Sequence, residues 1–588
     1  MIRDIITTAI QKALAGVGVN GATVNLEFPA ESTHGDFATN VAMIYAKQLG
    51  KNPKVFAEEL VELLLPLTKG KDGKGYEASL DANPSLDKGE VAEGPRGFVE
   101  RIEIAGPGFI NFFVSDEYFI KNLSEISENK NYGNSGMYAG KKILVEHSSP
   151  NLFKPFHIGH VMNNTIGESI TRLAKSSGAD VTVISYPSDV SLGIAKAVYI
   201  ILLDGVEKLN SMQSEAEKLA YLGECYVRGT KAFEESADVQ SRVKEITKHL
   251  YEHTPTPELD AYNIGKEINL EYFKTITSRL GSHFDDFIYE SEAGLVGKQI
   301  VLDNTGPVFT KSEGAVVYEG EKEGLHTRVF INSEGYPTYE AKDIGLMSLK
   351  FGRYNPDVSV FITDHEQTAY FNVVKNAAGK INKEWSDKTV HRTHGRMTFK
   401  GQKMSSRLGG VPVAAVLLDT IVEEVKEKNN TLDAKTADSI AIGALKFSIL
   451  RARAGSNIDF DPQTSLSFEG DSGPYLQYTT VRAKSILEKA KQQNIVGALD
   501  VGAKANQLER HLSRFPFIVE KSITEWAPHH IALYSAELAH LFNAWYANTK
   551  ILGDDVKQTQ HNVFVTSAVV CVMEKAINML GISVPEKM

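Results

Sequence analysis

The sequence predicts a multidomain α/β protein built around a doubly wound, Rossmann-like parallel sheet. Three short apolar segments, 143–145, 180–185 and 358–363, have the composition of buried strands, and helical stretches separate them. Alternation of strands and helices is typical of a parallel sheet covered by helices on both faces. At 588 residues the chain also exceeds what one hydrophobic core usually organises. We therefore expect further domains on either side of the sheet.

Residues 1–115 predict a small α+β domain. An amphipathic helix opens it, and a second apolar helix runs to about residue 65, where Pro66 favours a stop. Two β-like runs follow, separated by the Gly-Pro-Gly turn at 106–108. The Gly- and Lys-rich stretch 69–97 predicts an exposed loop between the helices and the strands.

The remaining boundaries follow from changes in pattern. A polar linker is expected at 116–140, and the Rossmann-like domain at 141–415, with an insertion at about 194–340. Residues 416–588 predict an all-α domain, because apolar residues recur there at helical spacing.

Composition limits the classes of function. A net charge of −11 excludes a chain that is basic all over, but not one that binds nucleic acid through a local basic cluster. Two cysteines cannot form a disulfide framework or a four-cysteine metal site, so we expect no structural zinc. Asp4 and Lys12 interrupt the N-terminal apolar residues, and the longest apolar run, 563–573, is shorter than the ~20 residues of a membrane span. These features predict a soluble cytoplasmic protein without a membrane partner.

The most specific motif is SSPNLFKPFHIGH, residues 148–160, directly after the first predicted strand. His157 and His160 share one face of a helix at this spacing, and Gly159 lets a flat ring approach the backbone. A strand that leads into a helix N-terminus is a favourable phosphate site. An isolated His-x-x-His pair is more often a surface or core feature, or half of a metal site, but here the whole string is present.

A second motif, GQKMSSRLGG, occupies residues 401–410. Lys403 and Arg407 lie between glycines, an arrangement that suits a closing loop which neutralises charge on a triphosphate. Most basic Gly/Ser loops are simply solvated surface. The order of the two motifs along the chain favours the functional interpretation.

Together these strings resemble the HIGH and KMSKS motifs of class I aminoacyl-tRNA synthetases. Residues 157–160 match the first letter for letter, whereas Ser406 replaces the second lysine of KMSKS. The arginyl family commonly lacks that lysine and carries one just before HIGH, where Lys154 stands. The resemblance implies binding of ATP, with Mg²⁺, and stabilisation of charge at its phosphates by His157, Gly159, His160, Lys154, Lys403, Met404 and Ser405.

Residues suited to an arginine substrate occur in three places. A guanidinium carries five donors in a planar fork, so its site needs carboxylates and other acceptors. Glu146 and Asn151 flank the start of the first motif, Tyr339 and Asp343 lie one helical turn apart, and Gln367 follows a predicted strand. By resemblance, the acid and the tyrosine contact the guanidinium, and the amides face the amino-acid end. The alternative is that these carboxylates are ordinary strand and helix ends.

One stretch departs from the family pattern. Residues 185–193, SYPSDVSLG, stand where many arginyl enzymes show a strand end near HVGDWGTQ. Asp189 is the candidate for the aspartate of that pattern.

Two regions resemble tRNA-binding domains of the arginyl family. In the C-terminal region, Tyr478 and Arg482 share a helix face and Tyr546 follows later, and such rings can stack unpaired bases. At the N-terminus, HGDFATNVA and GPGFINF match a domain that grips the outer corner of the tRNA, with Phe109 and Asn111 as candidate base contacts. Both of these residues also fit an ordinary strand.

The resemblance spans essentially the whole chain and implies an arginine–tRNA ligase that uses ATP, L-arginine and tRNA(Arg) and acts as a monomer. Three alternatives are weighed against it. The first is another class I synthetase, such as the cysteinyl type, and the second is a small-molecule adenylating enzyme of the HIGH superfamily, which would have no use for the C-terminal helical region. The third is a catalytically inactive RNA-binding relative.

Overall fold

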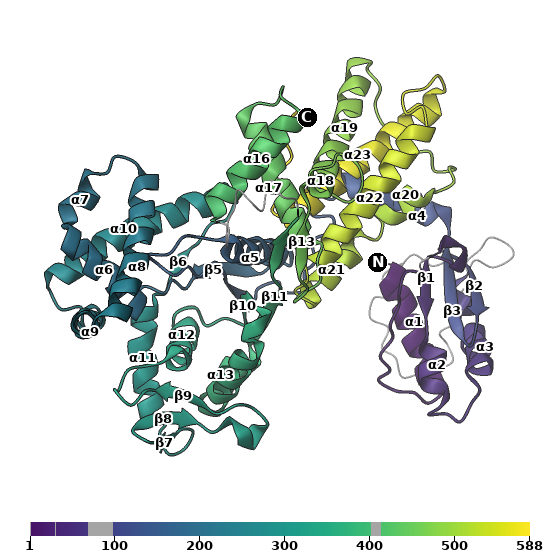
Figure 1. Cartoon of the computed structure of the whole chain (residues 1–588). Coiled ribbons are helices and arrows are strands. Elements are labelled where there is room, and N and C mark those ends of the chain that lie inside the picture. Colours follow the sequence, from purple (N-terminus) through teal and green to yellow (C-terminus); the bar gives the residue numbers. More distant parts are fainter. Residues whose placement is uncertain (1, 30, 69–97, 401–412) are drawn as a thin grey trace. The chain divides into compact units, whose positions relative to one another are not determined.

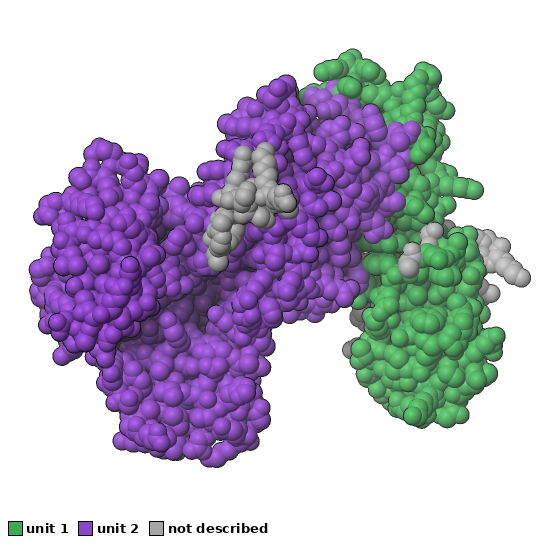
Figure 2. All heavy atoms as spheres, in the orientation of Figure 1, with its two compact units in different colours: residues 1–130, 489–514, 548–568 green, residues 131–488, 515–547, 569–588 purple. Residues whose placement is uncertain are grey.

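The computed structural model describes residues 2–29, 31–68, 98–400 and 413–588 (Figure 1). The chain forms two compact units, each assembled from separate stretches of sequence (Figure 2). One comprises 1–130, 489–514 and 548–568, and the other comprises 131–488, 515–547 and 569–588. The predicted multidomain α/β class is confirmed. The domain boundaries predicted above stay predictions, and the predicted loop at 69–97 lies outside the described residues.

The first unit contains the predicted N-terminal α+β fold. Helices α1 (Ile2–Gly16) and α3 (Pro53–Leu64) pack on an antiparallel sheet of order β1-β3-β2, which comprises Phe37–Thr39, Phe109–Val114 and Val99–Ala105. The buried apolar residues of α1 recur at helical spacing; they are Ile2, Ile6, Ile10, Ala13 and Leu14. Helix α4 (Asp116–Glu128) follows within the range predicted as a linker.

Arg510 connects a distant segment of the chain with the N-terminal part of this unit. Arg510 of α20 (Gln507–Leu512) donates to Asp36 at 2.7 Å and to Asp116 at 2.6 Å. Asp36 also accepts the backbone N–H of Val114 at 2.8 Å. Asp36 therefore has an ordering role at the sheet edge.

The second unit is built around a five-stranded parallel sheet of order β11-β10-β4-β5-β6. The strands are β4 (Lys142–Glu146), β5 (Asp180–Ser185), β6 (Asp286–Phe287), β10 (Val358–Asp364) and β11 (Thr389–His394). Helices cover both faces of the sheet, so its central strands read as continuous apolar runs. The chain passes from β4 to β5 on one side and returns to β10 on the other. This reversal is a topological switch point, where ligands of such folds bind at the carboxyl ends of the strands.

The region predicted as an insertion is divided by β6, a two-residue strand of the central sheet. Before β6 lies a helical group with its own apolar core, formed by α6 (Leu192–Asp204), α8 (Glu215–Glu235), α9 (Ala237–Glu252) and α10 (Pro257–Arg279). After β6 come α11 (Glu290–Asp303) and a small antiparallel sheet of β7 (Thr310–Ser312), β8 (Ala315–Tyr318) and β9 (Arg328–Ile331). The periodicity of the sequence did not reveal β6 because two residues carry no pattern.

From residue 414 the chain is helical, as predicted, apart from β13 (Ile458–Phe460), which pairs in parallel with β12 (Met397–Phe399). The main helices are α16 (Ala414–Lys428), α17 (Ala434–Leu450), α19 (Gly473–Gln492), α22 (His529–Asn548) and α23 (Val556–Met579). Of the helices that the structure describes, α23 alone is long and apolar enough to cross a membrane, and 61% of its most apolar window is buried within the protein. Core helices of folded domains share these properties.

Helix α12 (Tyr339–Tyr354) crosses α11 at very short range. A Cβ added to Gly297 of α11 would lie 1.8 Å from the carbonyl oxygen of Ala341, and one added to Gly345 of α12 would lie 1.9 Å from that of Ala293. Only glycine at these two positions lets the helix backbones approach this closely. The crossing fixes the position of α12 relative to the central sheet.

We predict that Gly297→Ala lowers the thermal unfolding midpoint of the second unit, at a cost of about 1–3 kcal/mol, because the added methyl meets backbone rather than a flexible side chain. The matched control is Gly352→Ala on α12, where the same methyl would meet no atom within 4 Å. That change should leave the midpoint unchanged or raise it, since alanine favours a helix by ~1 kcal/mol. Equal midpoints for the two variants in calorimetry would contradict the account of the crossing.

Candidate active site

The histidine motif forms the start of α5 (Ile158–Ser176), which follows β4 through a loop with two residues at positive φ, Ser148 and Phe153. His157 is the N-cap residue, and its Nδ1 accepts the backbone N–H of Gly159 at 3.1 Å. The Nδ1 of His160 accepts the backbone N–H of His157 at 3.1 Å. The two rings stack with centroids 3.9 Å apart. The imidazoles of the motif thus accept two backbone N–H groups at the N-terminus of its own helix, a role usually taken by hydroxyls and carboxylates.

Both imidazoles are neutral near pH 7. Burial, together with the charge of Lys154, lowers the pKa of His157. Burial, followed by His157 and Lys154, lowers the pKa of His160 to about 3. Because each Nδ1 accepts a hydrogen bond, the single ring proton resides on Nε2. The pair therefore offers two N–H donors, which suit phosphate oxygens.

Lys154 lies close to these rings and is exposed. Its ammonium stands 4.8 Å from the ring centroid of Tyr226 on α8, which orients it by a cation–π contact. The predicted residues Lys403, Met404 and Ser405 lie outside the described residues.

The predicted acids Glu146 and Asp343 are brought together beside the carboxyl end of β4. Glu146 is buried and accepts a hydrogen bond from Lys350 of α12 at 2.6 Å. Asp343, on the same helix, accepts one from the phenol of Tyr370 at 2.5 Å. Burial raises the pKa of Asp343 to about 8, with further contributions from nearby carboxylates, of which Glu146 is the largest.

Two further acids belong to this group. Asp189 is fully buried and accepts from Lys266 at 2.8 Å and from Ser291 at both its backbone N–H and its hydroxyl. Glu290 opens α11, lies 3.3 Å from Lys342, and has a pKa that burial raises despite that lysine.

Tyr186 lies close enough to all four carboxylates to be affected by their charges. The pKa of Tyr186 is raised well above its ordinary value, first by burial and then by Asp343, Glu290, Glu146 and Asp189. Its hydroxyl is buried and finds no hydrogen-bond partner in the described part of the chain. Sequence patterns did not single out Glu290, Lys342, Lys350 or Tyr186, because their partners come from other elements of the fold.

The lysines do not balance this group. Lys350, Lys266 and Lys342 each pair with one acid, namely Glu146, Asp189 and Glu290. Among the described residues, Asp343 has only the neutral phenol of Tyr370 as its hydrogen-bond partner. The group therefore lacks one positive charge, and a cationic ligand would supply it.

The side chains of the other predicted ligand residues, Tyr339, Gln367 and Asn151, are exposed. Tyr339 begins α12 and is 62% exposed, with Lys342 5.2 Å from its ring centroid. Gln367 caps α13 (Thr368–Ile381) and is exposed. Asn151 is exposed, and its backbone bridges to Ser188 in the loop after β5.

The predicted aromatic and basic face on α19 and α22 is present. The guanidinium of Arg482 lies 4.6 Å from the ring centroid of Tyr478 and 5.1 Å from that of Tyr546, and it donates to Asn543 and to the Tyr478 hydroxyl. Tyr546 is 41% exposed. These rings and the guanidinium form one surface suited to stacking.

In the first unit the two candidate base contacts differ. Phe109 is 39% exposed at the start of β3, whereas Asn111 is 5% exposed between its neighbouring strands. Phe109 is thus free to stack, while Asn111 would have to leave its buried position to contact a base.

Comparison with known families decides the identity. The model of the class I (R) tRNA synthetase catalytic domain matches residues 122–461. This chain belongs to the arginyl-tRNA synthetases. The arginyl tRNA synthetase N-terminal domain matches residues 1–68, and the DALR anticodon binding domain matches residues 476–588.

Similar proteins cover the full length. The chain is 29% identical over 601 residues to the arginine–tRNA ligase of Lactobacillus delbrueckii, with 100% of both chains covered. It is 29% identical to that of Clostridium perfringens, with 96% of each covered. The structure of the Thermus thermophilus arginyl-tRNA synthetase matches with a TM-score of 0.77 at 23% identity and covers 100% of both chains. That of the Plasmodium falciparum enzyme matches with a TM-score of 0.75 at 17% identity, covering 100% of this chain and 99% of the other.

These findings confirm the predicted fold and the predicted function as an arginine–tRNA ligase of class I. The alternative of another class I synthetase is excluded, because the matching catalytic model is the arginyl one. The family implies use of ATP and tRNA, whereas the roles of individual residues stay predictions.

The hydrogen bonds of the histidine motif predict different effects for two substitutions. His160→Gln keeps a donor near Nε2, whereas His160→Asn keeps only an acceptor near Nδ1. We expect the Asn variant to slow arginine-dependent ATP–pyrophosphate exchange by about 10²–10³-fold and the Gln variant to slow it less. The reverse order would show that the helix cap, not the Nε2 donor, is the essential feature.

Proposed function

We propose that the chain activates L-arginine with ATP to arginyl-adenylate and transfers the arginyl group to the terminal ribose of tRNA(Arg), and that Asp343 binds the arginine guanidinium. The observation that supports this role is the missing positive charge at Asp343, beside three acids that already have lysine partners. A guanidinium has a permanent charge and a planar fork of donors, which matches this deficit better than a neutral or small ligand does.

The surrounding residues suit the rest of the amino acid. Glu290 and the phenols of Tyr186 and Tyr339 supply further acceptors around Asp343. Asn151, Gln367 and Glu146 are our candidates for the amino-acid end, because Glu146 ends β4, Asn151 lies in the loop from β4 to α5, and Gln367 follows β10. Their side chains would direct the arginine carboxylate towards the α-phosphate of ATP.

The two reaction steps require positioning and charge stabilisation. The arginine carboxylate attacks the α-phosphate, forming a new P–O bond as the bond to pyrophosphate breaks. A terminal ribose hydroxyl of the tRNA then attacks the adenylate carbonyl and AMP leaves. The Nε2 donors of His157 and His160 would stabilise charge on the phosphate oxygens, and Lys154 and Lys403 would contact the pyrophosphate.

Further aspects belong to the same proposal. Mg²⁺ would arrive bound to the phosphates of ATP, its usual mode in nucleotide sites, and would neutralise their charge. Tyr478, Arg482, Tyr546 and Phe109 would bind unpaired bases of the tRNA by stacking. We expect a monomer that acts in the cytoplasm.

Substitution of Asp343 tests the guanidinium assignment. Removing one partner of a buried charge pair weakens binding by about 2–5 kcal/mol, so Asp343→Asn should raise the KM for arginine at least ~30-fold at pH 8. Thermal stability should stay the same or rise, because the free protein holds this acid without a cation. The control is Asp387→Asn, an acid whose side chain is 61% exposed on α14 (Lys383–Asp387), which should behave as wild type. An unchanged KM for arginine in the Asp343 variant would refute the assignment.

The raised pKa predicts a pH dependence. With a pKa of about 8, the carboxyl of free Asp343 holds a proton at pH 7, whereas the guanidinium complex requires the carboxylate. The KM for arginine should therefore fall by up to ~10-fold per unit as the pH rises from 6 to 7, and level off above about 8. Asp343→Asn should abolish this slope. A KM that is constant between pH 6 and 8 in the wild-type protein would contradict the prediction.

A further inference from the structure

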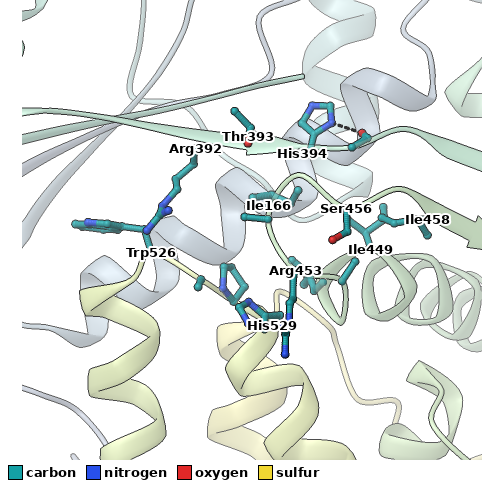
Figure 3. A pocket seen from close by; sticks show the side chains of 16 residues that line it. Ile166, Arg392, Thr393, His394, Ile449, Arg453, Ser456, Ile458, Trp526 and His529 are labelled. Atoms are coloured by element: carbon teal, nitrogen blue, oxygen red, sulfur yellow. Dashed lines mark hydrogen bonds between the residues drawn. The ribbon is translucent and has the colours of Figure 1, made fainter. Parts of the chain in front are cut away.

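A small cavity lies apart from the residues described above, within the second unit (Figure 3). Its volume is about 30 Å³, and its walls come from the end of β11, the loop after α17, one turn of α5 and the start of α22. Most of the lining is apolar and includes Ile166, Ile449 and Trp526. Two arginines, Arg392 and Arg453, interrupt this apolar lining.

Arg392 and Arg453 differ from other arginines of this unit in having no carboxylate as an ion-pair partner among the described residues. Arginines elsewhere in the unit form ion pairs, as Arg279 does with Asp438 and Arg451 with Asp471. Within the described residues no carboxylate lies within ion-pair distance of Arg392 or Arg453, and the Nε of Arg392 is buried without an acceptor. A buried donor without a partner destabilises the free protein, so a role in binding would account for its retention.

The nearest acid is already engaged. Burial lowers the pKa of Arg392, and the charge of Glu525 partly opposes this effect. The carboxylate of Glu525, however, already lies 2.6 Å from the ring nitrogen Nε2 of His530. Figure 3 shows Arg392 reaching from β11 towards Trp526, and Arg453 next to His529. Burial, followed by His530, lowers the pKa of His529 to about 4, so this imidazole is neutral and can also donate an N–H.

Two unpaired guanidinium groups and a neutral imidazole at one cavity fit an anion with several acceptor oxygens. A guanidinium binds two phosphate oxygens at once. Arg392 is half-buried and Arg453 is exposed, so an anion could reach both from solvent. The cavity opens beside β11 at the carboxyl side of the central sheet, and α5 carries both Ile166 and the histidine motif. A tRNA acceptor end that reaches the histidine motif would approach the same side of the sheet.

We propose that Arg392 and Arg453 form a binding site for a phosphate of the tRNA backbone. The inference rests on the action of the chain on tRNA, but not on the residues assigned above to arginine or ATP. A phosphate from a second source, the ATP triphosphate, has the same chemistry, and the experiment separates the two.

The test compares the Arg392→Ala/Arg453→Ala double variant with wild type in binding tRNA(Arg) at several KCl concentrations. Each lost phosphate contact reduces the slope of log Kd against log salt by about 1, so the double variant should lose about 1 to 2 in slope and roughly tenfold in affinity near 0.1 M salt. Arg392→Lys keeps the charge but not the planar guanidinium, so its affinity for tRNA should lie between those of wild type and the double variant. The KM for ATP at saturating tRNA should not change.

The matched control is Lys231→Ala/Lys383→Ala, which removes the same charge from side chains that are 75% and 86% exposed. If the arginine variant shows the same Kd and salt slope as this control, while wild type still charges tRNA, the phosphate site is refuted and the ligase function stands. A raised KM for ATP with unchanged tRNA binding would overturn the proposal in favour of the nucleotide. Failure of the wild-type protein to charge tRNA would instead refute the proposed function.

Discussion

The catalytic unit depends on how it offsets four neighbouring carboxylates, of which Glu146, Asp189 and Glu290 are buried and Asp343 is half-buried. Like charges in a region of low dielectric repel one another strongly, and each also loses its hydration. Three lysines offset three of these charges, and they come from α10 and α12 rather than from the segment that carries the histidine motif. Asp343 has no lysine partner; in the free protein its carboxyl group holds a proton and accepts a hydrogen bond from the phenol of Tyr370. The pocket is therefore prepared for one cation.

The scaffold explains how such distant residues meet. The reversal of strand order at β4 opens a crevice at the carboxyl ends, where the loop into α5 presents the two histidines. The glycine crossing of α11 and α12 brings Glu290, Lys342 and Asp343 to the same crevice. Helix α12 thus supplies both an acid and two of the lysines that balance its neighbours.

Much of this arrangement could be predicted from the sequence, and the exceptions have physical reasons. Strands β4, β5 and β10 were visible because strands buried on both faces consist of apolar runs, whereas β6 has only two residues. Glu146 and Asp343 were predicted because they lie at a strand end and one helical turn from Tyr339. Glu290 and Lys350 were missed, since no local pattern marks a residue whose partner lies 102 or 204 positions away. Tyr186 was missed because the acids around it come from other elements. The role of Asn111 stays a prediction, but the sequence did not reveal that its side chain is covered, because alternation along a strand does not show which polar side chain is buried.

Proton counting tests the central claim about Asp343 most directly. Calorimetric titration of the protein with arginine at pH 7, in two buffers of different ionisation enthalpy, gives the number of protons released on binding. The account predicts close to one proton released by the wild-type protein, because the guanidinium replaces the proton of Asp343, and none by Asp343→Asn. Arginine binding without proton release in the wild-type protein would show that Asp343 is already ionised, and would contradict the proposed charge deficit.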